Sequence, residues 1–156
     1  MIPLIIKETI KIRADEYGLD PDLVLAFVMV ESSGNPKATR YETNFYKRYI
    51  QPMLAKKEIE PKEAIGRATS FGLMQIMGEV AREYGFKGEF EELLEPSENL
   101  RWSLMHLKHF MRKYKTEGRD YAIAAYNAGT PRMKEGRFVN QSYVDKIHKY
   151  LGQIKA

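Results

Sequence analysis

The sequence contains no cysteine. Disulfide bonds, thiolate metal ligands and a cysteine nucleophile are therefore excluded. It also has no stretch near the ~18 apolar residues that a transmembrane helix requires, so we expect no stable membrane insertion. The N-terminal run Met1–Lys7 lacks the basic start and the long apolar core of a signal peptide, so we expect no such peptide here.

The sequence also lacks a long block of one charge and a glycine-rich phosphate loop. Charged residues make up 29% of the 156 residues and leave a formal net charge of +4, which favours an anionic partner. The basic residues are not interleaved with aromatic ones as in nucleic-acid-binding modules, so we expect an anionic wall polymer and no nucleic acid. With 44% hydrophobic residues the chain fits one compact domain over residues 1–156, which we expect to be a monomer.

What the sequence does contain is helical periodicity. Apolar residues recur at three- and four-residue spacing in several segments, and signals such as Gly18 and Asp20–Pro21 mark their ends. The predicted helices cover residues 4–17, 21–31, 70–84, 96–114, 121–126 (capped by Asp120) and 143–151. Residues 38–69 are interpreted as an insertion with helical pieces, one of which begins at Pro61. No region alternates with a period of two, so we predict an all-α domain.

One carboxylate departs from the pattern of its helix. Glu31 lies on the apolar, core-facing side, where an ionisable residue is rare without a functional reason. Burial and the negative end of the helix dipole should both raise the pKa of its carboxyl. A carboxylic acid that stays protonated near neutral pH is what protonation of a glycosidic oxygen requires. The alternative is a solvated helix-end residue or a buried partner of an arginine.

Four short segments add to this interpretation. They are Glu31–Pro36 (ESSGNP), Phe71–Met77 (FGLMQIM), Ala125–Gly129 (AYNAG) and Tyr143–Val144. In this order they resemble the four motifs of lytic transglycosylase domains of the soluble lytic transglycosylase type, whose fold goose-type lysozymes share. The resemblance covers nearly the whole chain. It implies a lysozyme-like helical domain with residues 38–69 inserted near the cleft.

The resemblance also implies roles for individual residues. Glu31 would be the catalytic acid/base. The expected substrate-binding residues are Ser32, Ser70, Gln75, Met77, Tyr126, Asn127 and Tyr143. Tyr126 and Asn127 end a short apolar helix, so they should donate hydrogen bonds into a cleft while the packing behind them holds them in place. Without the resemblance, Gln75 would be interpreted as solvated, and Met77 and the two tyrosines as core packing.

The sequence departs from the family pattern at three points. The distance between the first two motifs is much longer than in typical members, Arg40 stands where a serine is usual, and Val139 stands where a glutamate is often found. The longer interval contains Glu42, a candidate second catalytic carboxylate that would activate water for hydrolysis. The alternative for Glu42 is a surface glutamate paired with Arg40 or Lys47.

Two histidines one helical turn apart are the only candidates for a metal site. His106 and His109, with His148 as a third ligand, have a spacing compatible with metal binding. Lys108 between them and the lack of a clear acidic ligand favour a solvated helix face. We therefore expect no metal site and no cofactor.

The resemblance implies a lytic transglycosylase that acts on peptidoglycan glycan strands. It would cleave the β-1,4 bond between N-acetylmuramic acid (MurNAc) and N-acetylglucosamine (GlcNAc) and leave 1,6-anhydro-muramyl ends. One alternative is a lysozyme or chitinase on the same fold, with Glu31 as acid, Glu42 as base and chitin oligomers as a further substrate. A non-catalytic wall-binding module is the other. Action would take place in the cell wall or periplasm, by a phage-encoded endolysin or by a trimmed mature chain.

Overall fold

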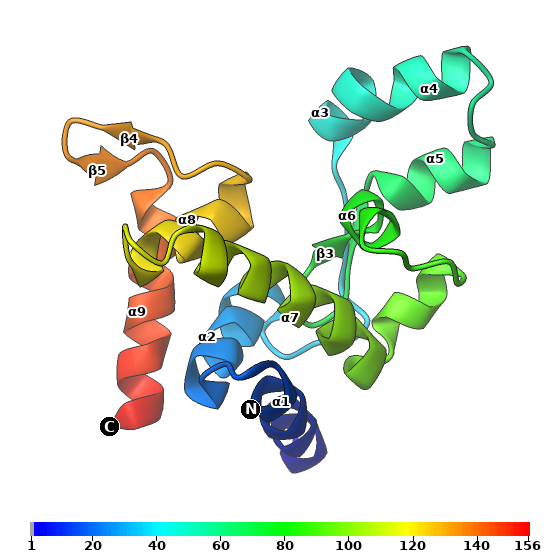
Figure 1. The fold of residues 1–156 in the computed structure, drawn as a ribbon. Coiled ribbons are helices and arrows are strands. Elements are labelled where there is room, and N and C mark those ends of the chain that lie inside the picture. Colours follow the sequence, from blue (N-terminus) through cyan, green and yellow to red (C-terminus); the bar gives the residue numbers. More distant parts are fainter. Residues whose placement is uncertain (1) are drawn as a thin grey trace.

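A helical core forms one part of the molecule (Figure 1). The structure, a computed structural model, describes residues 2–156. The core helices are α1 (Leu4–Tyr17), α2 (Pro21–Ser32), α7 (Pro96–Lys113), α8 (Arg119–Ala128) and α9 (Gln141–Lys155). The long helix α7 crosses the middle of the molecule and packs against α1 and α8, while α2 packs against α1 and α9. Most apolar side chains of α2 are therefore buried, with Leu23 and Phe27 fully enclosed.

The ends of the first core helices follow from local sequence. Gly18 takes the left-handed conformation, with φ 67°, that closes α1. Asp20 accepts a 3.0 Å hydrogen bond from the Asp22 N–H, and Pro21 is the first residue of α2, as predicted. The prediction for α8 is wrong in one detail, because this helix begins one residue before Asp120. The Asp120 carboxylate accepts a 2.7 Å hydrogen bond from His148 of α9 and does not cap the helix.

The second part of the molecule contains the inserted segment and a small sheet. Strands β1 (Thr39–Tyr41), β2 (Thr69–Phe71) and β3 (Ile76–Met77) form an antiparallel sheet in that order, in which Arg40 is opposite Ser70 and Ser70 is opposite Met77. Between β1 and β2 lie α3 (Thr43–Phe45), the π-helical turn η1 (Tyr46–Ile50), α4 (Gln51–Ala55) and α5 (Pro61–Arg67). These pieces share a small apolar core around Ile50 and Ala64. The predicted helical pieces, with one starting at Pro61, are confirmed.

The predicted helix over residues 70–84 is wrong in its first half. Strands β2 and β3 and the turn between them occupy residues 69–77, and only α6 (Gly78–Glu83) is helical. Gly72 and Gln75 have positive φ angles of 72° and 51°, which a right-handed helix does not allow. A side chain at position 72 would also overlap Asn99, so this turn requires glycine.

The turn between β2 and β3 is attached to α7 by one buried side chain. Asn99 donates 2.8 Å hydrogen bonds from Nδ2 to the carbonyls of Phe71 and Leu93. Its Oδ1 accepts a 3.1 Å hydrogen bond from the Met74 N–H. Leu93 belongs to the 3-10 turn η2 (Phe90–Leu94), which precedes α7. The second sequence motif is therefore fixed to the longest core helix.

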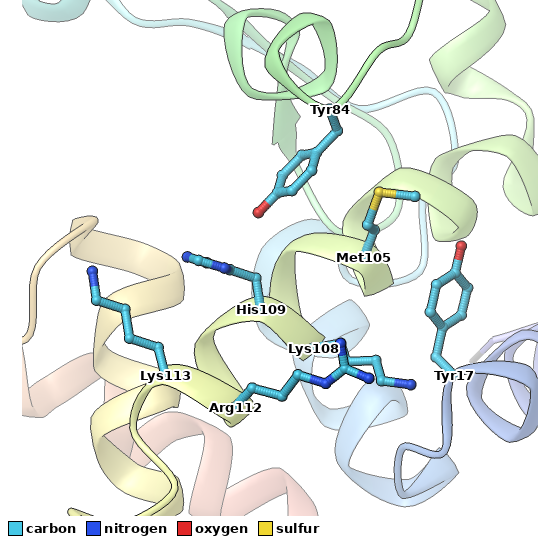
Figure 2. A pocket seen from close by; sticks show the side chains of 7 residues that line it. All are labelled: Tyr17, Tyr84, Met105, Lys108, His109, Arg112 and Lys113. Atoms are coloured by element: carbon cyan, nitrogen blue, oxygen red, sulfur yellow. The ribbon is translucent and has the colours of Figure 1, made fainter.

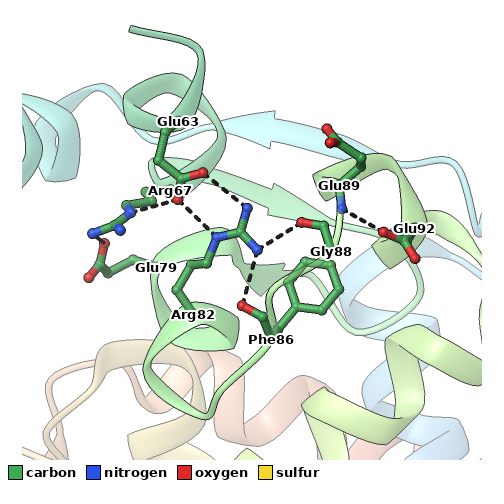
Figure 3. Close-up of polar contacts among 8 residues, drawn as sticks. All are labelled: Glu63, Arg67, Glu79, Arg82, Phe86, Gly88, Glu89 and Glu92. Atoms are coloured by element: carbon green, nitrogen blue, oxygen red, sulfur yellow. Dashed lines mark hydrogen bonds and ion pairs between the residues drawn. The ribbon is translucent and has the colours of Figure 1, made fainter. Parts of the chain in front are cut away.

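Ion pairs fix α6 against the inserted segment (Figure 3). Arg82 of α6 donates to the Glu63 carboxylate of α5 through Nε at 2.8 Å and Nη2 at 3.0 Å. Arg67 donates to the same carboxylate at 2.8 Å. The hydrogen bonds from Arg82 and Arg67 hold the pKa of Glu63 below its ordinary value, so the network stays charged at neutral pH.

A second, two-stranded sheet connects α8 to α9. Strands β4 (Met133–Lys134) and β5 (Arg137–Phe138) form a hairpin where the sequence predicts a loop. The strands throughout are short and helices dominate, so the predicted helical class of fold is confirmed, although the prediction of an all-α domain did not include these strands. Over residues 2–156 no helix combines the length and the apolar character needed to cross a bilayer. The longest helix, α7, carries basic side chains along one side (Figure 2).

Candidate active site

A groove of about 750 Å³ lies between the helical core and the sheet with its inserted segment. One wall comes from β2, β3 and the inserted segment, and the other from the end of α8 and the loop before α9. Glu31, at the end of α2, opens into it. The predicted site residues that line the groove are Glu31, Glu42, Ser70, Gln75, Met77, Tyr126 and Asn127.

Glu31 is held by Tyr143 of α9. The Tyr143 hydroxyl donates a 2.6 Å hydrogen bond to Glu31 Oε2, as expected from the position of the fourth motif. Burial raises the pKa of Glu31 from 4.5 to about 7, and the Tyr143 hydrogen bond and the Arg40 charge lower it by less. Glu31 therefore keeps its proton to a much higher pH than an ordinary glutamate.

Tyr143 is a permanent donor to this carboxyl. Burial, and then the neighbouring Glu31 charge, raise its pKa well above the ordinary value of 10.0. Its ring packs near that of Phe27, with centroids 6.3 Å apart. The carboxyl is thus oriented by a group that does not itself titrate at neutral pH.

Tyr126 differs from the expectation for its hydroxyl. The hydroxyl donates a 2.8 Å hydrogen bond to the Met74 carbonyl and not into the open groove. Its ring packs edge-on against Phe27, with centroids 5.0 Å apart. Tyr126 therefore supplies an aromatic surface to the groove and ties α8 to the second motif. The exposed Asn127 beside it accepts a 2.9 Å hydrogen bond from Asn140 through Oδ1.

Gln75 is fixed by its own amide group. Its Nε2 donates 3.0 Å hydrogen bonds to the carbonyls of Ala38 and Gly72, so the side chain bridges the inserted segment and the second motif. Ala38 begins the inserted segment. The carboxamide oxygen of Gln75 remains as the group that can accept a hydrogen bond from a ligand.

Glu42 lies beside the groove in an ion pair. Its Oε1 accepts a 2.7 Å hydrogen bond from Arg40 Nε and a 3.2 Å hydrogen bond from the Ser70 hydroxyl. Of the two interpretations of Glu42 from the sequence, the structure thus shows the pairing with Arg40. The charges of Arg40 and Glu42 act on the pKa of Glu31 in opposite directions.

Neither Tyr143 nor Ser32 lines the groove, so the expected contact of each with substrate needs correction. Tyr143 contacts Glu31, whereas Ser32 is tied to the second motif. The Ser32 hydroxyl approaches the Leu73 carbonyl at 2.8 Å and the Val28 carbonyl at 3.2 Å. Helical geometry places a serine at this position next to the carbonyl four residues earlier. Ser32 joins the end of α2 to the second motif and in this way supports Glu31.

Comparison with known proteins identifies the family of this chain. Residues 8–146 match the family model described as the transglycosylase SLT domain. The chain belongs to this family. It is also similar to a protein named "Transglycosylase" from Enterobacteria phage PRD1, with 28% identity over 147 residues, which are 94% of this chain and 43% of that protein. The chain therefore spans less than half of the length of this relative. The resemblance seen in the four motifs is confirmed by the family match.

This SLT domain has groove residues that the sequence analysis does not predict. Phe45, Arg48 and Tyr49 of the inserted segment line the groove, and the rings of Phe45 and Tyr49 lie 5.0 Å apart. Their spacing of four residues is a helical pattern that indicates one shared face. Arg132 and Val139 line the groove from the hairpin side.

His106 is a further groove residue, and its expected solvated position is wrong. It is largely buried beside Phe110 and Tyr126, and its Nδ1 shares a 2.8 Å hydrogen bond with the Tyr84 hydroxyl. Burial lowers the pKa of His106 from 6.5 to about 4, so the ring is neutral at neutral pH. Within residues 2–156 no three side chains of the metal-binding types form a cluster.

Proposed function

We propose that this SLT domain is a peptidoglycan lytic transglycosylase with Glu31 as its acid and base. Glu31 donates its proton to the oxygen of the bond between MurNAc and GlcNAc while the bond from the anomeric carbon to that oxygen breaks. The muramyl O6 hydroxyl then attacks the anomeric carbon and gives its proton to the Glu31 carboxylate. The new bond closes a 1,6-anhydro ring and leaves Glu31 protonated as at the start.

The Glu31 carboxyl, which lies in the groove and is held by Tyr143, is the observation that carries this proposal. A single group that gives a proton in one step and takes one in the next works best when its pKa lies near the ambient pH. Burial raises the pKa of Glu31 to about 7, and Tyr143 orients the carboxyl through a 2.6 Å hydrogen bond. A purely wall-binding module would gain nothing from a buried acid in its groove, so catalysis is the better interpretation.

The surroundings of Glu42 favour transglycosylation over hydrolysis. A hydrolase of the lysozyme or chitinase kind would use Glu42 as the base that activates water. One oxygen of Glu42 already accepts hydrogen bonds from both Arg40 and Ser70. We therefore assign Glu42 a structural part in the groove wall and give the second proton transfer to Glu31.

The charge of the groove favours peptidoglycan over chitin as substrate. Arg40, Arg48 and Arg132 line it. Arg40 is paired with Glu42, so Arg48 and Arg132 supply the positive charge beside the acid Glu31. Peptidoglycan strands carry peptides with carboxylate groups, whereas chitin is uncharged, so the basic side chains attract the former. Both walls come from the same chain, and we accordingly propose that residues 1–156 act as one catalytic domain and as a monomer. Its place of action would be the cell wall or periplasm.

Digestion of purified peptidoglycan, followed by mass spectrometry of the products, tests the proposal. We expect products with 1,6-anhydro ends from the wild type. Glu31→Gln should lower turnover by about 10²–10⁴, as expected for a lost general acid. Glu117→Gln, which changes an exposed carboxylate outside the groove, should match the wild type. Reducing ends would identify a hydrolase instead, and an active Glu31→Gln variant would refute the assignment of the acid.

A parallel digestion of chitin oligomers tests the choice of substrate. We expect the wild type to cleave peptidoglycan and to leave chitin oligomers intact or nearly so. Equal rates on the two polymers would show that the arginines of the groove do not select the substrate.

A further inference from the structure

A second hollow, of about 710 Å³, lies on α7 outside the groove (Figure 2). Basic residues form one side of it, namely Lys108, His109, Arg112 and Lys113. Tyr17, Tyr84 and Met105 complete its lining with aromatic and apolar surface. Among residues 2–156, no acidic side chain lines this basic hollow.

The basic side chains of the hollow are not neutralised by the protein. Within residues 2–156, Lys108, Arg112 and Lys113 take part in no ion pair. Arg112 and Lys113 lie in the last turn of α7, where positive charge is favoured by the helix dipole. Lys108 lies more than one turn before the end of α7, so the helix dipole does not explain a positive charge at this position. A cluster of unpaired positive charges of this kind attracts an anionic ligand.

The basic hollow borders the catalytic groove. Tyr84 lines the hollow, His106 lines the groove, and the two side chains share a 2.8 Å hydrogen bond. A ligand that leaves the groove over this pair of side chains reaches the basic side of α7 directly. The hollow runs from Met105 to Lys113, which is roughly 12 Å along a helix axis. Four residues of extended peptide cover about the same length, roughly 13 Å.

We propose that the basic hollow binds the carboxylate groups of the stem peptide carried by a muramyl residue in the groove. The peptide is attached to the sugar through the lactyl group, so it leaves the glycan near the reacting bond. Arg112 can bind a carboxylate through two parallel hydrogen bonds, and Lys108 supplies a second charge along the peptide. This assignment rests on the proposed action on peptidoglycan and extends it to the peptide decoration of the substrate.

Binding of a free stem peptide tests the proposal without catalysis. The probe is a tetrapeptide with the carboxylates of D-glutamate and of its C-terminus, added to Glu31→Gln protein and followed by NMR. We expect amide shift changes in residues 105–113 that weaken at high salt, because exposed charge pairs are screened. They should be lost in Lys108→Gln/Arg112→Gln. They should persist in Lys146→Gln/Lys149→Gln, which removes the same charge from the exposed side of α9.

Rates on two forms of the substrate give the second test. On strands that carry stem peptides, Lys108→Gln/Arg112→Gln should lower kcat/KM about tenfold, mainly through KM, as expected from the loss of two solvent-exposed ion pairs. On strands freed of peptide by an amidase, the same variant should match the wild type. An equal loss on both forms would overturn the proposal while leaving the transglycosylase assignment intact.

Two further outcomes distinguish a carboxylate site from a phosphate site, and failure of this proposal from failure of the proposed function. If poly(glycerol phosphate) and not the tetrapeptide shifts the amides of residues 105–113, the hollow binds a phosphate polymer and the proposal is wrong. If the wild type cleaves neither form of the strand, the proposed function fails. The peptide titration still decides in that case whether the hollow binds carboxylates.

Discussion

Replacing Glu31 by glutamine should stabilise the folded protein at alkaline pH while it removes activity. The folded state keeps the Glu31 proton up to a pH of about 7, whereas a carboxyl with the ordinary pKa of 4.5 loses it earlier in the unfolded chain. The wild type therefore loses stability as the pH rises from 4.5 through 7. Glutamine has nearly the same shape, stays neutral and still offers an oxygen to the Tyr143 hydroxyl.

The size of the effect follows from the pKa of Glu31. The rise from 4.5 to about 7 corresponds to roughly 3 kcal/mol of unfolding free energy lost above pH 7, at 1.36 kcal/mol per unit. For a chain of this length each kcal/mol moves Tm by ~2–4 °C, so the variant should melt roughly 6–12 °C higher than the wild type. At pH 4 both proteins hold a neutral side chain at position 31, and their Tm values should agree.

Thermal unfolding followed by circular dichroism at pH 4 and pH 8.5 measures this difference. Glu117→Gln is the matched control, because it makes the same chemical change on an exposed side chain outside the groove. Its Tm should follow that of the wild type at both values of pH, since surface substitutions stay within about 0.5 kcal/mol. An equal Tm for Glu31→Gln and wild type at pH 8.5, or a difference that does not depend on pH, would refute the reasoning.

Three further variants test other parts of the site. Tyr143→Phe removes a hydrogen bond that lowers the pKa of Glu31, so the alkaline limb of a pH profile of kcat/KM should move to higher pH. Glu42→Gln should leave anhydro ends as the main product in mass spectrometry and should lower stability by only about 0.2–1 kcal/mol, because its ion pair with Arg40 is solvent-exposed. Asn99→Ala leaves three buried backbone groups without their partner, so urea unfolding should show a loss of about 3 kcal/mol or more.

The helices of the core could be predicted because their signals are local. Gly18, Asp20 and Pro21 act on residues within one turn of themselves, and the structure places them as caps and first-turn residues. The partly buried position of Glu31 also follows from periodicity, since α2 is apolar along the side that faces the core.

The strands of the second motif could not be predicted, because their cause is not local. The turn after β2 depends on Asn99, which is 25 residues away from Met74 in the sequence and binds its N–H. The positive φ of Gln75 is equally invisible to a periodicity argument, since glutamine is common in helices. A run of apolar residues as short as 70–77 fits helix and strand alike.

The role of a polar side chain is harder to predict than its position. Tyr126 lies in the groove as expected, yet its hydroxyl binds the Met74 carbonyl. The sequence does not show which backbone carbonyls lack a hydrogen-bond donor. Such a carbonyl accepts the hydrogen bond from the Tyr126 hydroxyl. The same reason applies to Ser32, whose hydroxyl donates a hydrogen bond to the Leu73 carbonyl.

The inserted segment affects the acid through a pair of opposite charges. Arg40 alone would lower the pKa of Glu31, and Glu42 alone would raise it. The two form a 2.7 Å ion pair, so Glu42 offsets part of the effect of Arg40 on the pKa of Glu31. The segment can thus bring Arg40 into the groove for an anionic substrate while burial and Tyr143 still decide the proton affinity of Glu31. Loss of Glu42 would leave the Arg40 charge uncompensated, which lowers the pKa of Glu31 and leaves less of it protonated at neutral pH.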